Sequence, residues 1–140
     1  MRFMVLVKAN KESEKGVLPT EQELKEMGKF NDELIKAGAM LAGEGLHPSS
    51  KGVRLDFSGN RSTVIDGPFA ETKELLAGFW IVQFKSLAEA IEVFKRAPFK
   101  EGELELRQIY EEADFGQELV SKAPEVFEKE RQFREQSAKR

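Results

Sequence analysis

A chain of 140 residues with 40% apolar and 34% charged residues fits one well-solvated globular domain that is large enough to bury a core. The net charge of −3 disfavours nucleic-acid binding, and the absence of cysteine excludes disulfides, thiolate metal ligands and a cysteine nucleophile. No apolar run approaches the length of a membrane span, and the N-terminus lacks the pattern of a signal peptide. We therefore expect a cytoplasmic protein that does not associate with membranes.

The first third of the chain predicts a strand, a loop and a helix. The continuous apolar run Phe3 to Val7 is typical of a central strand buried on both faces, and the polar stretch from Ala9 to Pro19 predicts a loop. Thr20 and Glu23 have the spacing of a capping box, so we expect a helix to begin there. Its apolar stripe is interrupted only by Asn31.

The middle of the chain predicts four strands, two of which form a hairpin. Residues 39–46 predict a short strand, and the alternating residues 53–57 and 61–65 predict a hairpin with one solvated face. Residues 75–84 form the strongest strand pattern, in which Trp80 shares a face with the apolar residues two positions away.

The next segment completes a second β-α-β pattern. Ser86 and Glu89 have the spacing of another capping box, Pro98 ends that helix, and residues 103–110 predict the last strand. Two β-α-β halves predict an α+β fold, a ferredoxin-like sandwich of the dimeric α/β-barrel type with an inserted hairpin. Both helices would cover one sheet face, so the bare face predicts a homodimer packed sheet against sheet.

Residues 114–140 predict a helical C-terminal extension to a domain of residues 1–113. Two short helices fit the apolar pattern, with Pro124 as the first residue of the second. The extension would lie over its own domain or over a partner subunit. A frayed, solvated terminus from about Glu130 is the alternative.

The stretch Asp66-Gly67-Pro68-Phe69-Ala70-Glu71-Thr72-Lys73-Glu74 is the main candidate for a functional loop. One interpretation of Asp66 is structural, since an Asp before a Gly-Pro turn can accept a hydrogen bond from the N–H of Phe69. The other is functional, with Asp66 as a general acid/base or substrate-orienting carboxylate at the mouth of a pocket.

A second polar cluster, Gly43-Glu44-Gly45-Leu46-His47-Pro48, lies upstream. His47 is the single histidine of the chain, so it is either a proton-transfer partner of a carboxylate or a surface residue with no role. One histidine without a ligand spacing predicts no metal site. Glu44, between two glycines, is expected either close to a ligand or exposed.

The remaining candidates also have two interpretations. The mixed charges after Phe69 are typical of solvated surface, although Thr72 and Lys73 would also suit an anionic group beside Asp66. Trp80 fits the sheet core or a dimer interface, or the aromatic wall of a pocket. The candidate catalytic residues are Asp66 and His47, and the candidate substrate-binding residues are Glu44, Phe69, Glu71, Thr72, Lys73 and Trp80. No nucleotide-binding motif is present in the sequence, so we expect no cofactor.

The run from Asp66 to Glu74 resembles the signature of the DGPF-type branch of the YCII-related family. The Gly43 to Pro48 segment and Ala77-Gly78-Phe79-Trp80 are also similar, and the resemblance covers about residues 1 to 110. It implies a ferredoxin-like domain that dimerises through its sheets and an active site built around a His and an Asp. The Asp corresponds to Asp66. The family's histidine lies in the first helix, where Met27 stands nearest in this chain.

Two functions are consistent with these features. The first is a homodimer that binds a small molecule in a polar pocket near Asp66, Glu44 and His47 and does acid/base chemistry there. The second is a non-catalytic regulatory or accessory module whose C-terminal helices bind a partner. The family resemblance links this second function to transcription regulation.

Overall fold

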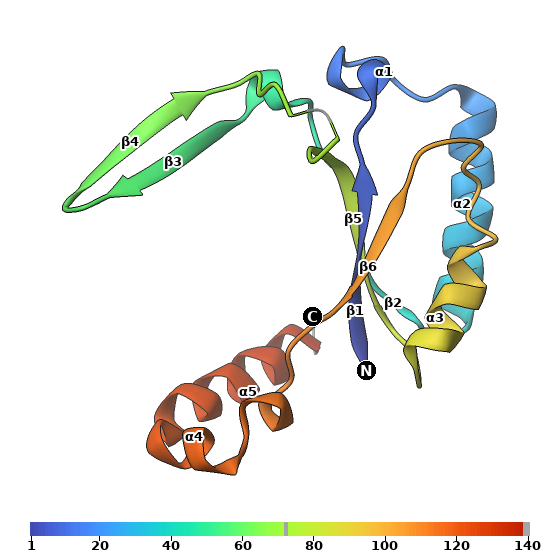
Figure 1. Cartoon of the computed structure of the whole chain (residues 1–140). Helices are drawn as coiled ribbons and strands as arrows, with labels where there is room; N and C mark the ends of the chain where they lie inside the picture. The colour runs from blue at the N-terminus through green and yellow to red at the C-terminus, as the bar shows by residue number, and fades with distance from the viewer. Residues whose placement is uncertain (72, 139–140) are drawn as a thin grey trace. The chain divides into compact units, whose positions relative to one another are not determined.

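The structure is a computed structural model that describes residues 1–71 and 73–138. The chain divides into two compact units, Met1–Gln108 and Ile109–Arg140. Each unit is coloured by residue number in Figure 1. Thr72, a candidate binding residue, lies outside the described residues.

The first unit contains a four-stranded antiparallel sheet with the strand order β2-β5-β1-β6. Its strands are β1 (Arg2–Lys8), β2 (Met40–Gly45), β5 (Leu76–Gln83) and β6 (Leu104–Gln108). Since β1 pairs with both β5 and β6, its predicted central place in the sheet is confirmed. The mixed α+β class is also confirmed, and the strand order is compatible with a ferredoxin-like fold.

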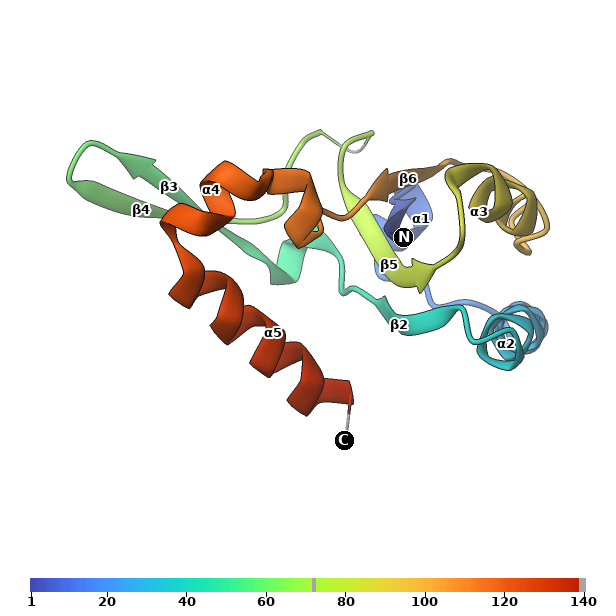
Figure 2. The same cartoon turned by 90° about the horizontal axis from the view of Figure 1, so that it is seen from below.

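Two longer helices cover one face of this sheet, as the views in Figures 1 and 2 show. The helices of the first unit are α1 (Lys11–Glu14), α2 (Glu21–Lys36) and α3 (Leu87–Phe94), with a 3₁₀ turn η1 (Ser49–Lys51). The prediction of a loop throughout residues 9–19 is wrong, because α1 lies inside it. The Asn10 side chain accepts a hydrogen bond from the Ser13 N–H, and the Ser13 hydroxyl accepts one from the Asn10 N–H.

The first predicted capping box is confirmed and the second is only half formed. The Glu23 N–H donates to the Thr20 hydroxyl at 3.1 Å, and the Thr20 N–H donates to the Glu23 carboxylate at 3.0 Å. Ser86 caps α3 in the same way, but the Glu89 carboxylate accepts from the N–H of Lys85 instead of Ser86. α3 also ends at Phe94, four residues before Pro98.

The core lies between the sheet and the two helices. Its buried members are Phe3, Val5, Phe30, Leu34, Ala39, Trp80, Val82, Ala90 and Phe94. β1 buries alternate residues, so the prediction of burial on both faces is wrong for this chain alone. Asn31, the one polar residue in the apolar stripe of α2, has a hydrogen-bond partner in the core. Its side-chain oxygen accepts a hydrogen bond at 2.9 Å from the indole N–H of Trp80.

The opposite sheet face carries no helix of the first unit. It is formed by half-buried apolar residues on the two central strands, and we call Met4, Leu6, Phe79 and Ile81 the helix-free face. Met4 pairs with Ile81 and Leu6 pairs with Phe79. On the neighbouring strand β2, Glu44 pairs with Phe79 and therefore lies on the same face.

A separate hairpin links the two halves of the four-stranded sheet. It consists of β3 (Val53–Ser58) and β4 (Arg61–Asp66), and every residue of both strands is exposed. Gly59 in the turn has a φ of +61°, which favours glycine. Alternation places Val53, Leu55, Phe57 and Val64 on one side, which we call the apolar ribbon face.

The second unit contains the two helices predicted for the C-terminal extension. They are α4 (Gln117–Lys122) and α5 (Pro124–Ala138), preceded by a 3₁₀ turn η2 (Glu112–Phe115). Pro124 begins α5 as predicted, and the helix continues well beyond Glu130, so a frayed terminus does not describe these residues. The buried Phe127 packs at 5.5 Å from the ring of Phe115. Within residues 1–71 and 73–138, none of the helices has the length and apolar content required to cross a bilayer.

Candidate functional site

The loop that follows Asp66 is anchored to the 3₁₀ turn η1 through its glycine. The Gly67 N–H donates a hydrogen bond to the Gly52 carbonyl at 3.0 Å. A Cβ atom at Gly67 would lie 1.7 Å from the carbonyl oxygen of Ser49, so the two backbones approach too closely for any other residue. The Gly67–Pro68 peptide bond is cis. The loop therefore follows a path that only a glycine at this position permits.

A chain of hydrogen bonds connects this loop to helix α1. The backbone N–H of Ser49 donates to the Glu14 carboxylate at 3.0 Å, and the Ser49 hydroxyl donates to the same carboxylate. The hydroxyl in turn accepts from the Phe69 N–H at 3.1 Å. The structural interpretation of Asp66 as acceptor of the Phe69 N–H is therefore wrong, since Ser49 satisfies that donor.

Arg54 holds the outer side of the loop. Its guanidinium carbon lies 3.8 Å from the centre of the Phe69 ring, within the range of a cation–π interaction. Its Nη2 also lies 3.3 Å from the carboxylate of Glu71. A hydrogen bond from the backbone of Glu71 itself, followed by the positive charge of Arg54, lowers the pKa of the Glu71 carboxyl from its ordinary value.

The candidate ionisable residues lie on three neighbouring segments of the chain. Asp66 is the last residue of β4 and pairs with Val53, Glu44 lies on β2, and His47 lies between β2 and η1. All three side chains are exposed. Among the described residues, no hydrogen bond or ion pair joins any two of them, so their convergence on one site stays a prediction.

The other candidates are divided between the loop and the core. Phe69 is half-buried under Arg54, and Lys73 is exposed. Trp80 is 5% exposed and packs edge-to-face against the rings of Phe30 and Phe94. The structure thus places Trp80 in the core, the first of its two interpretations.

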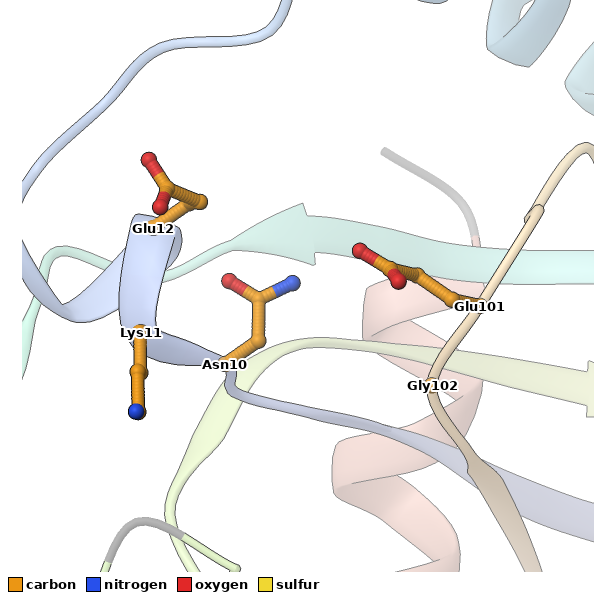
Figure 3. Close-up of a pocket in the computed structure, with 5 residues that line it drawn as sticks. All are labelled: Asn10, Lys11, Glu12, Glu101 and Gly102. Carbon is orange, nitrogen blue, oxygen red and sulfur yellow. The ribbon is translucent and has the colours of Figure 1, made fainter.

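A cavity of about 360 Å³ lies elsewhere on the first unit, beside helix α1. It is lined by Asn10, Lys11, Glu12, Glu101 and Gly102, none of which the sequence identified as a candidate. Figure 3 shows the Glu101 side chain pointing toward Asn10. The Asn10 oxygen is already used to cap α1. Within the described residues, no group of three or more His, Asp or Glu side chains is arranged to hold a metal ion.

Three residues that hold the loop were missed from the sequence. Glu14 was interpreted as part of a polar loop and Arg54 as a strand residue of the hairpin, and Ser49 was not among the candidates. The spacing of Asn10 and Ser13 is a capping signal that could have predicted α1. No local pattern connects Glu14 with Ser49, because 35 residues separate them.

Comparisons with known proteins place these features in a family. The model of the YCII-related domain matches residues 1–113. The uncharacterized protein R00369 of Rhizobium meliloti (strain 1021) is 33% identical over 72 residues, which are 51% of this chain and 58% of that protein. The chain therefore matches less than two thirds of that relative's length.

Among solved structures, the chain is similar to 5-chloro-2-hydroxyhydroquinone dehydrochlorinase (TftG) from Burkholderia phenoliruptrix AC1100, in complex with 2,5-dihydroxybenzoquinone. The TM-score is 0.46 at 13% identity, covering 79% of this chain and 94% of the other. The match to the family model spans most of the chain, including both polar clusters and the whole four-stranded sheet. The chain belongs to the YCII-related domain family.

Proposed function

We propose that this chain is a cytoplasmic, homodimeric small-molecule-binding domain of the DGPF-type branch, and that Asp66 does acid/base chemistry on the bound molecule. One observation carries the proposal. The Asp66 carboxylate is exposed and makes no hydrogen bond or ion pair with the rest of the described chain, although the loop that follows it is tightly anchored. A carboxylate that is not needed by its own turn is available to a ligand.

The neighbouring segments would supply the rest of the site. His47 would exchange a proton with the ligand or with Asp66, because an imidazole changes its charge near neutral pH. Glu44, Phe69, Glu71, Thr72 and Lys73 would contact the ligand. Arg54 would release Glu71 and bind an anionic group of the ligand, since a guanidinium recognises carboxylate and phosphate geometries equally well.

The homodimer is proposed from the helix-free face. Met4, Leu6, Phe79 and Ile81 are half-buried apolar residues with no helix of their own unit above them. Packing this face against its copy would give the dimeric α/β-barrel form of a ferredoxin-like fold with an inserted hairpin.

The test is ligand binding by substituted chains. A library of metabolites is screened for thermal stabilisation of the parent, and each hit is then titrated calorimetrically against Asp66→Asn and His47→Ala. Asp56→Asn is the control, because Asp56 is an exposed carboxylate on the other face of the same hairpin. We expect the two site variants to lose affinity for at least one hit and the control to retain it. If both site variants bind every hit as the parent does, the site is wrong.

A second function is a regulatory or accessory module that recruits a protein partner through residues 114–140. It is favoured by the exposed apolar side chains of the second unit, Leu119, Val126 and Phe133. A chain ending at residue 113 should then lose a partner that the full chain retains in a pull-down. Unchanged ligand binding by the shortened chain would instead favour the first function.

A further inference from the structure

The hairpin carries an apolar surface that the rest of the first unit leaves exposed. On the apolar ribbon face, Val53, Leu55 and Val64 are each more than half exposed and Phe57 is 77% exposed. The register pairs Leu55 with Val64, so these side chains form one continuous strip along the ribbon. The other face carries mostly polar residues, including the Asp56 and Thr63 pair.

Such a ribbon is poorly stable by itself. A two-stranded hairpin is marginal in water, and it gains stability when its apolar face packs against another surface. Both strands of this hairpin are also edges, since neither pairs with the four-stranded sheet. Isolated apolar side chains on a surface are ordinary, but four on one face of an unsupported ribbon indicate a binding surface.

The direction of the hairpin indicates what covers it. In both views the hairpin projects from the sheet on the side away from α2 and α3, which is the side of the helix-free face (Figures 1 and 2). A second copy that covers the helix-free face therefore lies within reach of the hairpin. The strands β3 and β4 carry Arg54, Arg61, Asp56 and Asp66, so they bring no net charge that would repel an identical chain.

We propose that the apolar ribbon face packs on a second copy of this chain, that the copy's hairpin packs back in the same way, and that this contact completes the candidate site at Asp66. The reciprocal arrangement is the one that a two-fold symmetric dimer requires. The part that concerns Asp66 rests on the function proposed above.

The position of Asp66 links the proposed dimer contact to the candidate site. Asp66 pairs with Val53 and therefore lies on the same side of the ribbon as the apolar residues, at the end of the hairpin where the loop containing Gly67 begins. In the single chain its carboxylate is exposed to water. A partner that covers the apolar ribbon face would exclude water from this end of the ribbon and enclose the carboxylate with its ligand. Catalytic carboxylates act more effectively in such an enclosed site.

The matched pairs of the hairpin provide the test. The double variant Leu55→Ser/Val64→Ser removes one directly paired apolar couple, and Asp56→Ser/Thr63→Ser removes the neighbouring couple on the opposite face. Sedimentation velocity over a range of concentrations then measures the dissociation constant of the dimer. We expect the apolar variant to raise this constant by about tenfold or more and the polar control to leave it near the parent value. Trp80 fluorescence verifies that both variants keep the core, which the hairpin does not contribute to.

Carboxyl footprinting measures the effect on the site. Carbodiimide coupling to a small amine, followed by peptide mass spectrometry, should label Asp66 several-fold less in the parent dimer than in the apolar variant. Asp56 should be labelled equally in both. This inference is overturned if the apolar variant dimerises as tightly as the parent, or if Asp66 is labelled equally in the parent and in the apolar variant. The proposed ligand site would stand in both cases. A parent that is monomeric at every concentration overturns both this inference and the homodimer. If Asp66→Asn binds ligands as the parent does, the proposed ligand site is overturned and the dimer contact stands.

Discussion

The Ser49 hydroxyl accepts a hydrogen bond from the backbone N–H of Phe69 at 3.1 Å, across 20 residues of sequence. The same hydroxyl donates to the Glu14 carboxylate. The hydrogen bond that would have been expected within the Asp66 turn is thus made by a side chain from a different loop. Asp66 is therefore not the acceptor of this N–H, and Ser49 holds the loop beside it in position.

Replacement of Ser49 should loosen this loop. Ser49→Ala leaves the half-buried Phe69 N–H without its acceptor and removes one of the two donors to the Glu14 carboxylate, at a cost of about 1–3 kcal/mol in the free energy of unfolding. Urea denaturation measures the change. The adjacent exposed residue is the control, and Ser50→Ala should change stability by less than about 0.5 kcal/mol. Equal effects of the two substitutions would show that the hydrogen-bond chain does not stabilise the fold.

A methyl group at Gly67 should displace the loop. In Gly67→Ala the new carbon would meet the Ser49 carbonyl at 1.7 Å, so one backbone must move, and we expect a loss of about 2 kcal/mol or more. Gly45→Ala is the comparison, because no atom lies within 4 Å of a Cβ at that position. Thermal unfolding of both variants checks the difference. A Gly67→Ala protein as stable as Gly45→Ala would contradict the close approach of the two backbones.

The polar residue in the apolar stripe of α2 should be needed for the core. Asn31→Ala removes the acceptor of the Trp80 indole N–H and should destabilise the protein by about 1–3 kcal/mol. Because Trp80 is the single tryptophan, its fluorescence should also shift. Asp32→Ala, an exposed neighbour on the same helix, should leave the emission unchanged. An unchanged spectrum in Asn31→Ala would contradict the assigned hydrogen bond.

The capping box of α2 should contribute to stability in a pH-dependent way. Hydrogen bonds from the backbone N–H and then the hydroxyl of Thr20 lower the pKa of Glu23 below its ordinary value of 4.5. The folded state therefore favours the carboxylate. Its contribution is complete above the ordinary pKa and is lost as the pH falls through the lowered value.

Glu23→Gln tests this contribution, because it keeps an acceptor oxygen and removes the titration. The stability difference between the parent and Glu23→Gln should be largest at neutral pH and should shrink toward about pH 3. Urea denaturation at a series of pH values measures it. A constant difference for Glu23→Gln would contradict the assigned cause of the shift.

Local patterns predicted most of the first unit. The Thr20 and Glu23 spacing located the start of α2, and the apolar alternation around Trp80 located β5 and its buried side, because both signals arise between residues within a few positions of each other. The hydrogen-bond chain around the Gly67 loop was missed for the opposite reason. Glu14 and Ser49 meet only after β1, α2 and β2 have placed their loops at one end of the sheet.

The same limit applied to Asp66. Its position after a strand and before a Gly-Pro pair correctly indicated a loop, and the sequence made the Phe69 N–H the obvious partner. The competing acceptor was a serine in a distant turn, and no spacing rule connects the two. Arg54 was likewise interpreted only as a strand residue, although its side chain reaches back to the ring of Phe69.

Strand β2 contains a β-bulge, because one of its residues has no partner on the neighbouring strand β5. Met40 pairs with Val82 while Ala42 pairs with Ile81, so the register shifts at Leu41. The bulged residue changes which of the following β2 side chains face the core and which face the other side of the sheet. Met40 and Gly43 consequently both pair with core residues, and Glu44 lies opposite Phe79 on the outer side. If Leu41 instead paired regularly with Ile81, Glu44 would lie opposite Gly78, on the same side as the core residue Trp80. The bulge at Leu41 therefore determines whether this acidic group faces solvent or the interior.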